Sequence, residues 1–318
     1  MRKTRICELL GIEYPIVQGA MSWIANGELA AAVSEAGGLG IIGRNAAWDG
    51  RGEWTDNLRR QIRIAKERTT KPFGVNIVVL DPRVQDVADL VAEEKVPVVT
   101  TSAGNPAVLT RFLKEKGIKV LHVVASCRHA VGAEKAGVDA VVAEGYEAGG
   151  HDGMDELPTF VLVPQVVDAV KVPVVAAGGI ADGRGFVAAL ALGAEGVQIG
   201  TRFIATTECC AHPAFKQAVL EALDTSTTVT GRKIGPTRGI KNAFTAKLTE
   251  MEFAGASAEQ LEEFIGIGRS PAGQLRGDLE EGELYCGAIA GLVTEIVSAG
   301  EVVRRIVEDA ERVLASLH

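Results

Sequence analysis

Val175-Ala-Ala-Gly-Gly-Ile180 and Val197-Gln-Ile-Gly-Thr-Arg-Phe203 are the two stretches of this sequence that decide its fold. Each is an apolar run of the kind that forms a buried strand, and each run leads into glycine. Glycine lets an anion approach the main chain closely, so that backbone N–H groups and the Thr201 hydroxyl can bind phosphate oxygens. Two such loops in succession are typical of the phosphate site after the seventh and eighth strands of a (β/α)8 barrel. The alternative is that these glycines serve only the close packing of strands on helices.

Outward from these loops, short apolar runs alternate with helical stretches over the first two-thirds of the chain. Most of the predicted strands are apolar throughout, as expected when both of their faces are covered. The predicted strands are 15–20, 38–43, 73–78, 98–103, 119–126, 140–145, 172–178 and 196–204. The predicted helices are 27–36, 54–68, 84–94, 107–116, 130–136, 159–170 and 183–192.

Eight strands at this spacing predict an α/β fold, a closed parallel (β/α)8 TIM barrel. An open doubly wound sheet is the competing arrangement. Small or polar residues follow most of the predicted strands, which is where barrel enzymes build their sites. The first strand is not followed by the GxGxxG turn of a dinucleotide-binding sheet. Both features favour closure of the sheet.

The regular alternation ends after Ile204, and this change divides the chain. Residues 1–207 are predicted to form the barrel. Residues 208–285 are predicted to form a smaller, mostly helical lid over its mouth, with helices at 212–223 and 258–265 and an extended piece at 227–230. Residues 286–318 are predicted to return to the barrel, with an amphipathic helix over 288–317.

Composition excludes several classes of protein. The net charge of −8 argues against nucleic acid as a partner, because phosphate backbones require a basic surface. No run of about 18 apolar residues predicts a membrane span. The five cysteines have neither metal-ligand nor CxxC spacing, so a reduced cytoplasmic setting and no metal site are expected.

The loop after the sixth strand, Ala143-Glu-Gly-Tyr-Glu-Ala-Gly-Gly-His-Asp-Gly153, places one imidazole among glycines. The small residues allow a planar ligand to lie against the backbone. His151 can then polarise a carbonyl or move a proton near neutral pH, with Glu144 and Glu147 as neighbours. A hydrogen-bonding residue of a surface loop is the alternative for His151.

Two further strand ends complete a predicted ring of polar and small groups. Gly19, Ala20 and Met21 follow the first strand, and Asn76 lies on the third. Asn76 and the backbone at Ala20 and Met21 are candidates to hydrogen-bond the edge of a heterocycle. No GxSxG, HExxH or P-loop motif is present, so neither a serine hydrolase nor a metalloprotease is indicated.

Together these residues resemble the nitronate monooxygenase and enoyl-acyl-carrier-protein reductase II family of FMN-dependent barrels. The likeness runs over nearly the whole chain and is far more specific than any one glycine motif. Its motifs are Gln18-Gly-Ala-Met21, Ala36-Gly-Gly-Leu-Gly40, Gly74-Val-Asn76, Glu147-Ala-Gly-Gly-His151, Leu162-Val-Pro-Gln165, Ala177-Gly-Gly-Ile180 and Gly200-Thr-Arg202.

The resemblance implies FMN as cofactor and NADH or NADPH as hydride source. It implies hydride transfer to the flavin N5 and then to the β-carbon of an enoyl thioester, with His151 as catalytic residue. The partner that it implies is an enoyl thioester or acyl carrier protein. It also suggests a homodimer. The cofactor-binding residues that it implies are Gly19, Ala20, Met21, Asn76, Glu144, Gly149, Gly150, Gln165, Gly178, Gly179, Gly200 and Thr201.

The reductase branch is the closer likeness, on Met21-Ser-Trp-Ile-Ala25, Ala181-Asp-Gly-Arg184 and Ile240-Lys-Asn242. Two positions depart from it. Ala288 stands where the reductases are expected to have Gln, and Asp152 stands where an apolar residue is expected. Both departures concern the acyl acceptor, and a nitronate monooxygenase that oxidises alkyl nitronates with oxygen is the alternative.

The sequence disfavours two other functions. A flavin- or nucleotide-binding regulatory protein without turnover is disfavoured by the open barrel mouth and by His151. A barrel that resembles inosinate dehydrogenase would need a nucleophilic cysteine in the loop after the sixth strand, and residues 143–153 contain none.

Overall fold

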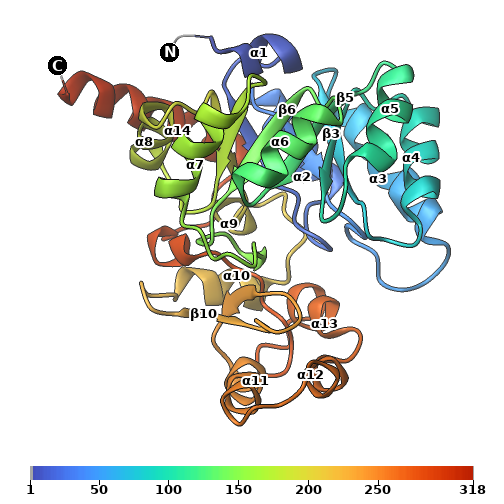
Figure 1. Cartoon of the computed structure of the whole chain (residues 1–318), viewed down its shortest axis with the longest axis vertical. Coiled ribbons are helices and arrows are strands. Elements are labelled where there is room, and N and C mark those ends of the chain that lie inside the picture. The colour runs from blue at the N-terminus through green and yellow to red at the C-terminus, as the bar shows by residue number, and fades with distance from the viewer. Residues whose placement is uncertain (1–2, 318) are drawn as a thin grey trace.

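Eight parallel strands form a barrel in the computed structural model, which describes residues 3–317 (Figure 1). Their order around the barrel is β1-β9-β8-β6-β5-β4-β3-β2. The strands are β1 (Ile16–Gln18), β2 (Gly40–Ile42), β3 (Phe73–Val78), β4 (Val98–Ser102), β5 (Lys119–Val124), β6 (Ala140–Glu144), β8 (Val174–Ala177) and β9 (Gly196–Ile199). The predicted TIM barrel is therefore confirmed.

A buried glutamine completes the seam between β1 and β2, where the ladder is reduced to one bridge between Val17 and Leu39. The backbone N–H of Gln18 donates to the carbonyl of Leu39 at 2.8 Å. Its side-chain Oε1 accepts from the N–H of Ile41 at 2.9 Å and so takes the place of a ladder bond. The sheet is closed here, and the open doubly wound alternative is wrong.

Alternate residues of each strand face the barrel interior and the surrounding helices. On β6, Ala140 and Val142 belong to the interior cluster, whereas Val141 and Ala143 pack in the outer one. Helix α1 (Arg5–Leu10), near the N-terminus, also supplies apolar side chains to the interior cluster. Because the strand period is two, Glu144 is the next inward position and lies at the mouth of the barrel.

Eight helices surround the barrel. They are α2 (Gly27–Glu35), α3 (Trp54–Arg68), α4 (Val84–Glu93), α5 (Ala107–Glu115), α6 (Cys127–Lys135), α7 (Thr159–Ala169), α8 (Gly183–Ala191) and α14 (Ala299–Ser316). The seven that were predicted between strands are confirmed, with small differences at their ends. The C-terminal α14 packs against α8 and α2 and completes the ring (Figure 1).

Two predictions at the C-terminal side of the barrel are wrong in part. Residues 201–204 are not the end of the eighth strand but a short helix, α9 (Thr201–Ile204), because the chain leaves the sheet at Gly200 with φ −104° and ψ −72°. Residues 288–317 are not one helix. A 3-10 helix, η1 (Ala288–Leu292), comes first, and α14 begins only after Ser298, whose side chain caps the N–H of Glu301.

The chain between the barrel and α14 contains more sheet than predicted. A hairpin of β10 (Thr227–Thr230) and β11 (Thr237–Ile240) pairs with β7 (Gly150–His151). The helices are α10 (Pro213–Leu220), α11 (Ala243–Phe253), α12 (Ala258–Ile265) and α13 (Arg269–Arg276). Threonine and arginine at these strand positions obscure the alternation of polar and apolar residues by which a strand is predicted. The partner of β7 is also distant along the chain, so the pairing could not be predicted locally.

Residues 227–285, which we call the lid, gather at one end of the barrel (Figure 1). The lid has its own small apolar cluster of Phe244, Leu248 and Leu261. By contrast, Phe215 and Val219 of α10 belong to the large outer cluster of the barrel. Ile240 and Leu284 of the lid also belong to that outer cluster, so the lid packs on the barrel as well as on its own cluster.

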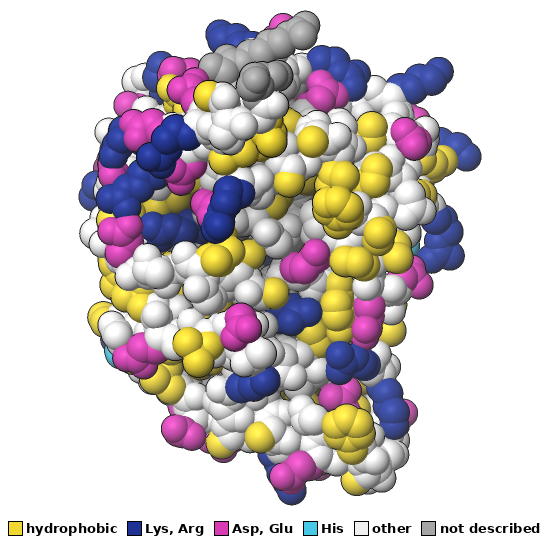
Figure 2. Space-filling model, turned by 90° about the vertical axis from the view of Figure 1, so that its left-hand side faces the viewer, with side chains coloured by type: hydrophobic (Ala, Val, Ile, Leu, Met, Phe, Trp, Pro, Cys, Tyr) yellow, Lys and Arg dark blue, Asp and Glu magenta, His cyan; other side chains and the backbone are white. Residues whose placement is uncertain are grey.

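Positive and negative side chains are intermixed on the side of the molecule that carries α8 and α14 (Figure 2). Ion pairs such as Arg304–Glu308 and Arg184–Asp182 lie on these two helices. Exposed pairs of this kind contribute little to the free energy of unfolding. Among residues 3–317, no helix combines the length and hydropathy that crossing a bilayer requires.

Candidate functional site

A cavity of about 1080 Å³ lies between the carboxyl ends of the barrel strands and the lid. Its walls contain the ends of β1, β3, β6, β8 and β9, the loop around His151, and three lid side chains, Ser270, Gln274 and Tyr285. Twelve of the predicted site residues line it together: Gly19, Ala20, Met21, Asn76, Glu144, Gly149, Gly150, His151, Gly178, Gly179, Gly200 and Thr201.

Gln165 does not line this cavity, although the resemblance implied it as a cofactor-binding residue. It lies on the exposed side of α7, where its amide donates to the carbonyl of Val161 at 2.6 Å. The buried side of the same helix carries Leu162, Val163 and Val166. The helical period therefore turns Gln165 away from the barrel mouth.

The backbone at Gly178 and Gly179 forms a cradle that side chains would strain. Both residues have positive φ values, +86° and +72°, in the left-handed region. A Cβ added to Gly178 would lie 2.6 Å from the carbonyl oxygen of Gly145. Among the hydrogen bonds within residues 3–317, none uses the N–H groups of Gly178, Gly179 or Gly200. These donors are available to an anion.

Gly200 differs from the other two glycines because its own backbone does not require glycine. A Cβ there would meet only Met21, at 3.9 Å, so the space beside Gly200 belongs to the cavity. The neighbouring Thr201 accepts a hydrogen bond from the N–H of Gly287 through Oγ1, at 2.8 Å, and its own O–H remains able to donate. The N–H groups and the Thr201 hydroxyl can therefore both donate to a phosphate.

Asn76 occupies an inward position on β3 but its amide nitrogen is already bonded. It donates to the carbonyl and the hydroxyl oxygen of Thr100, each at 3.1 Å. The side-chain oxygen of Asn76 is 3.4 Å from the Ser102 hydroxyl, a weak contact. The side-chain oxygen of Asn76 can therefore still accept a hydrogen bond from a ligand, and the bonds to Thr100 fix the orientation of the amide.

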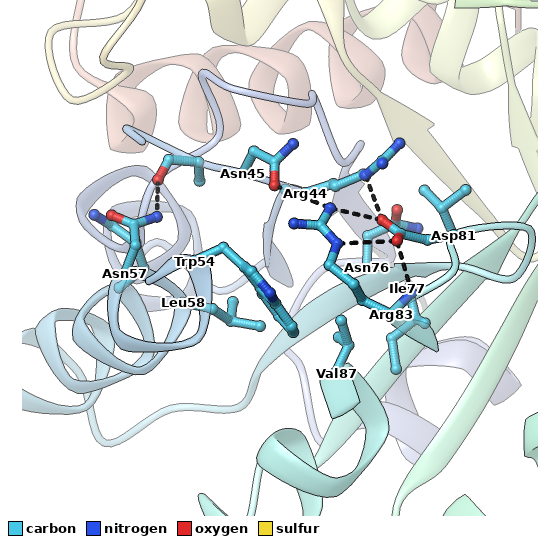
Figure 3. A pocket seen from close by; sticks show the side chains of 14 residues that line it. Arg44, Asn45, Trp54, Asn57, Leu58, Asn76, Ile77, Asp81, Arg83 and Val87 are labelled. Atoms are coloured by element: carbon cyan, nitrogen blue, oxygen red, sulfur yellow. Dashed lines mark hydrogen bonds and ion pairs between the residues drawn. The ribbon is translucent and has the colours of Figure 1, made fainter. Parts of the chain in front are cut away.

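A cluster of charged side chains lies near Asn76, around a second, small cavity lined by the loop after β2, by α3 and by the end of β3 (Figure 3). Arg44 and Arg83 converge on the buried Asp81, at 2.7 and 2.8 Å, and hold its pKa at about 2. The Arg83 guanidinium also lies 4.7 Å from the centre of the Trp54 ring. Arg44 lines the large cavity as well, and so brings a fixed positive charge to its wall.

Two carboxyl groups near His151 favour their protonated forms. Glu144 lines the cavity, where loss of solvation raises its pKa to about 7. Both carboxyl oxygens of Asp152 are buried and have no hydrogen-bond partner within residues 3–317. Burial, and then the charge of Glu144, raises the pKa of Asp152 to about 9. Asp152 is therefore an uncharged acid at neutral pH.

Replacement of Asp152 by Asn is expected to change how stability depends on pH. A pKa raised from 3.8 to about 9 means that the folded state binds the proton more tightly, so stability is lost as pH rises through this window. The difference amounts to at most about 1.4 kcal/mol for each unit of pKa shift. In thermal melts at roughly pH 6 to 9, Asp152→Asn should melt above the parent, increasingly so toward pH 9.

Asp155→Asn is the matched control for this prediction, because Asp155 is exposed in the same loop. It should follow the parent at every pH. Parallel pH dependence in the parent and in Asp152→Asn would show that Asp152 is solvated and charged.

His151 is held in the cavity wall beside a lid tyrosine. The imidazole and the Tyr285 ring meet edge to face, with centres 5.9 Å apart and planes at 72°. Loss of solvation lowers the pKa of His151 below its usual value, Glu283 opposes that change, and Arg44 adds to it. The imidazole is thus neutral at pH 7, with one N–H donor and one acceptor nitrogen.

The sequence did not single out Arg44, Ser270, Gln274 or Tyr285 as site residues. Arg44 could have been found, because it follows Gly43 at the end of the predicted second strand, where barrel sites collect polar groups. The three lid residues lie in a segment without a readable motif, and only the folding of the lid brings them to the cavity.

The sequence matches a known protein family over most of its length. A family model described as nitronate monooxygenase matches residues 3–94 and 85–309. A protein of Staphylococcus saprophyticus named probable nitronate monooxygenase is 34% identical, over 98% of this chain and 98% of its own.

Two solved structures are similar over almost the full chain. FabK from Thermotoga maritima is 46% identical with a TM-score of 0.92, and the match covers 100% of this chain and 99% of that chain. A nitroalkane oxidase from Streptomyces ansochromogenes is 27% identical with a TM-score of 0.80, over 98% and 99% of the two chains.

Proposed function

Since the chain belongs to the nitronate monooxygenase family of flavin-dependent oxidoreductases, we propose that it is an FMN-dependent enoyl-acyl-carrier-protein reductase using NADH or NADPH. The observation that carries the proposal is the 46% identity to FabK over the whole chain, against 27% to the nitroalkane oxidase. This difference favours the reductase branch, to which the motifs around Met21 and Ile240 also point.

The residues of the cavity suit FMN. The free N–H groups of Gly178, Gly179 and Gly200 would hold its phosphate, and the space beside Gly200 would receive it. The cavity exceeds the volume usual for one drug-sized ligand, so it can admit a flavin and a second reactant together. When bound, FMN would supply the hydride chemistry that links the nicotinamide to the acceptor.

His151 is the residue assigned to the acyl acceptor. Its neutral imidazole has an N–H that can donate to the thioester carbonyl and stabilise the negative charge that develops there. In its protonated form, the imidazole could instead transfer a proton to the α-carbon and return to the neutral form. Arg44, on the opposite wall, adds a positive charge that favours anionic ligands within the cavity.

The test uses the purified flavoprotein under anaerobic conditions. Addition of NADH or NADPH should bleach the flavin, and a crotonyl or longer 2-enoyl thioester should then restore its colour. Bleaching without restoration by any enoyl thioester would remove the acyl substrate from the proposal. Comparison of the two nucleotides gives the cofactor preference in the same experiment.

Nitronate oxidation is the second candidate, favoured by the family model and by the 34% identical relative from Staphylococcus saprophyticus. In that reaction His151 would act as base or anchor for the nitronate. An enzyme of this type should leave the flavin oxidised when NADH or NADPH is added, and should consume oxygen when an alkyl nitronate is added.

A further inference from the structure

The lid, rather than the barrel, supplies the contacts that hold His151. Its backbone belongs to β7, which pairs with β11 so that His151 lies opposite Thr237. Its side chain meets the ring of Tyr285. Both partners come from residues 227–285, so the position of the imidazole depends on how the lid is folded.

Tyr285 is itself locked by two other lid side chains. Its hydroxyl donates to Oε2 of Glu283 at 2.8 Å. The Ser270 hydroxyl donates to the same carboxylate and lies 3.1 Å from the Tyr285 hydroxyl. These hydrogen bonds hold the far end of the phenol in place, so they keep the ring beside His151.

Charged groups reach His151 from opposite sides. Glu283 is the anion on the lid side, and it favours the charged imidazole. Arg44 is the cation at the end of β2, and it disfavours the charged form. Glu144 and Asp152 also border this cavity, and both favour their neutral forms. Glu283 is therefore the lid group that opposes the lowering of the His151 pKa.

We propose that Tyr285 and Glu283 are positioning residues for His151: the tyrosine ring fixes the plane of the imidazole, and the glutamate carboxylate stabilises its protonated form. The inference rests on the proposed function only in giving His151 a role at the acyl acceptor. The structural part concerns the state of one side chain and is measurable without turnover.

Titration of the His151 ring by nuclear magnetic resonance tests the glutamate. In the flavin-bound protein labelled at histidine, and with the His151 signal assigned from a His151→Gln variant, the parent pKa should lie below 6.5. Glu283→Gln keeps the shape and the acceptor for Tyr285 but removes the charge. It should lower the His151 pKa further, by on the order of half a unit.

Glu281→Gln is the matched control for charge, because Glu281 lies two positions away with 58% of its side chain exposed and pairs with Arg269. It should leave the His151 titration unchanged. Arg44→Gln, which removes the opposing charge, should raise the His151 pKa. An identical His151 titration in the parent and in Glu283→Gln would overturn the electrostatic role of Glu283.

A second pair of variants tests the tyrosine independently of charge. Tyr285→Ala removes the ring and should broaden the His151 ring signals and slow flavin reoxidation by an enoyl thioester about tenfold, with flavin affinity retained. Tyr285→Phe keeps the ring and should restore both properties. Sharp His151 signals and normal reoxidation in Tyr285→Ala would overturn the positioning role.

The outcomes separate this inference from the proposed function. If no enoyl thioester reoxidises the flavin, the proposed substrate fails, but the His151 titrations still decide the role of Glu283. If reoxidation occurs in the parent and none of the lid variants alters the His151 signals, the proposed function stands and this inference fails.

Discussion

Gly200→Val is expected to give a folded protein that is purified without its yellow flavin. The conformation at Gly200 has a negative φ, and a side chain there would meet only Met21 at 3.9 Å, so valine fits the protein itself. It would instead fill the space in which a phosphate reaches the N–H groups of Gly179 and Gly200. Loss of two charge-assisted hydrogen bonds should weaken FMN binding about 100-fold or more, measured by fluorescence titration of the flavin-free protein.

Riboflavin provides the control for this variant because it lacks the phosphate. The parent should bind FMN much more tightly than riboflavin, whereas Gly200→Val should bind the two alike. Thermal melting should show that the variant is folded. Retention of FMN at the parent's affinity by folded Gly200→Val would place the phosphate elsewhere in the cavity.

His151→Ala is expected to separate the two halves of the catalytic cycle. Reduction of the bound flavin by NADH or NADPH should proceed at nearly the parental rate, because the proposed role of His151 is confined to the acyl acceptor. Reoxidation by an enoyl thioester should slow by about 100-fold or more, the range typical of a lost general acid or hydrogen-bond donor. Anaerobic stopped-flow absorbance of the flavin measures both steps in one instrument.

His151→Gln distinguishes the two ways in which the histidine can act. Glutamine retains an N–H donor but cannot exchange a proton near neutral pH. Partial recovery relative to alanine indicates polarisation of the carbonyl, and equal loss indicates proton transfer. Reoxidation at the parental rate in both variants would remove His151 from the reaction.

Local order in the sequence predicted the barrel and much of its site. Strand and helix periods are set by neighbouring residues. The eight strands and seven intervening helices could therefore be predicted without knowing which segments pack against them. Glycines at the ends of the seventh and eighth strands and the glycine-flanked His151 are likewise contiguous signals. The carboxyl ends of parallel strands meet at one rim, which is why these separate motifs line a single cavity.

Several features depended on contacts between distant segments. The amide of Gln18 closes the seam of the barrel by bonding Ile41. The outward face of α7 carries Gln165 away from the cavity. The hairpin of the lid pairs with β7, which contains His151, and no local sequence pattern predicts this pairing.

The protonation states of the site residues depend on the tertiary structure. In the sequence, Asp152 and Glu283 are ordinary acids, and Tyr285 has no evident relation to His151. Folding buries Asp152 beside Glu144 and brings Tyr285 and Glu283 to the imidazole. The sequence alone therefore determines the residue types and predicts where the strands end. It does not determine the charge that each group carries, because desolvation and Coulomb forces depend on every group that folding brings near it, whatever its position along the chain.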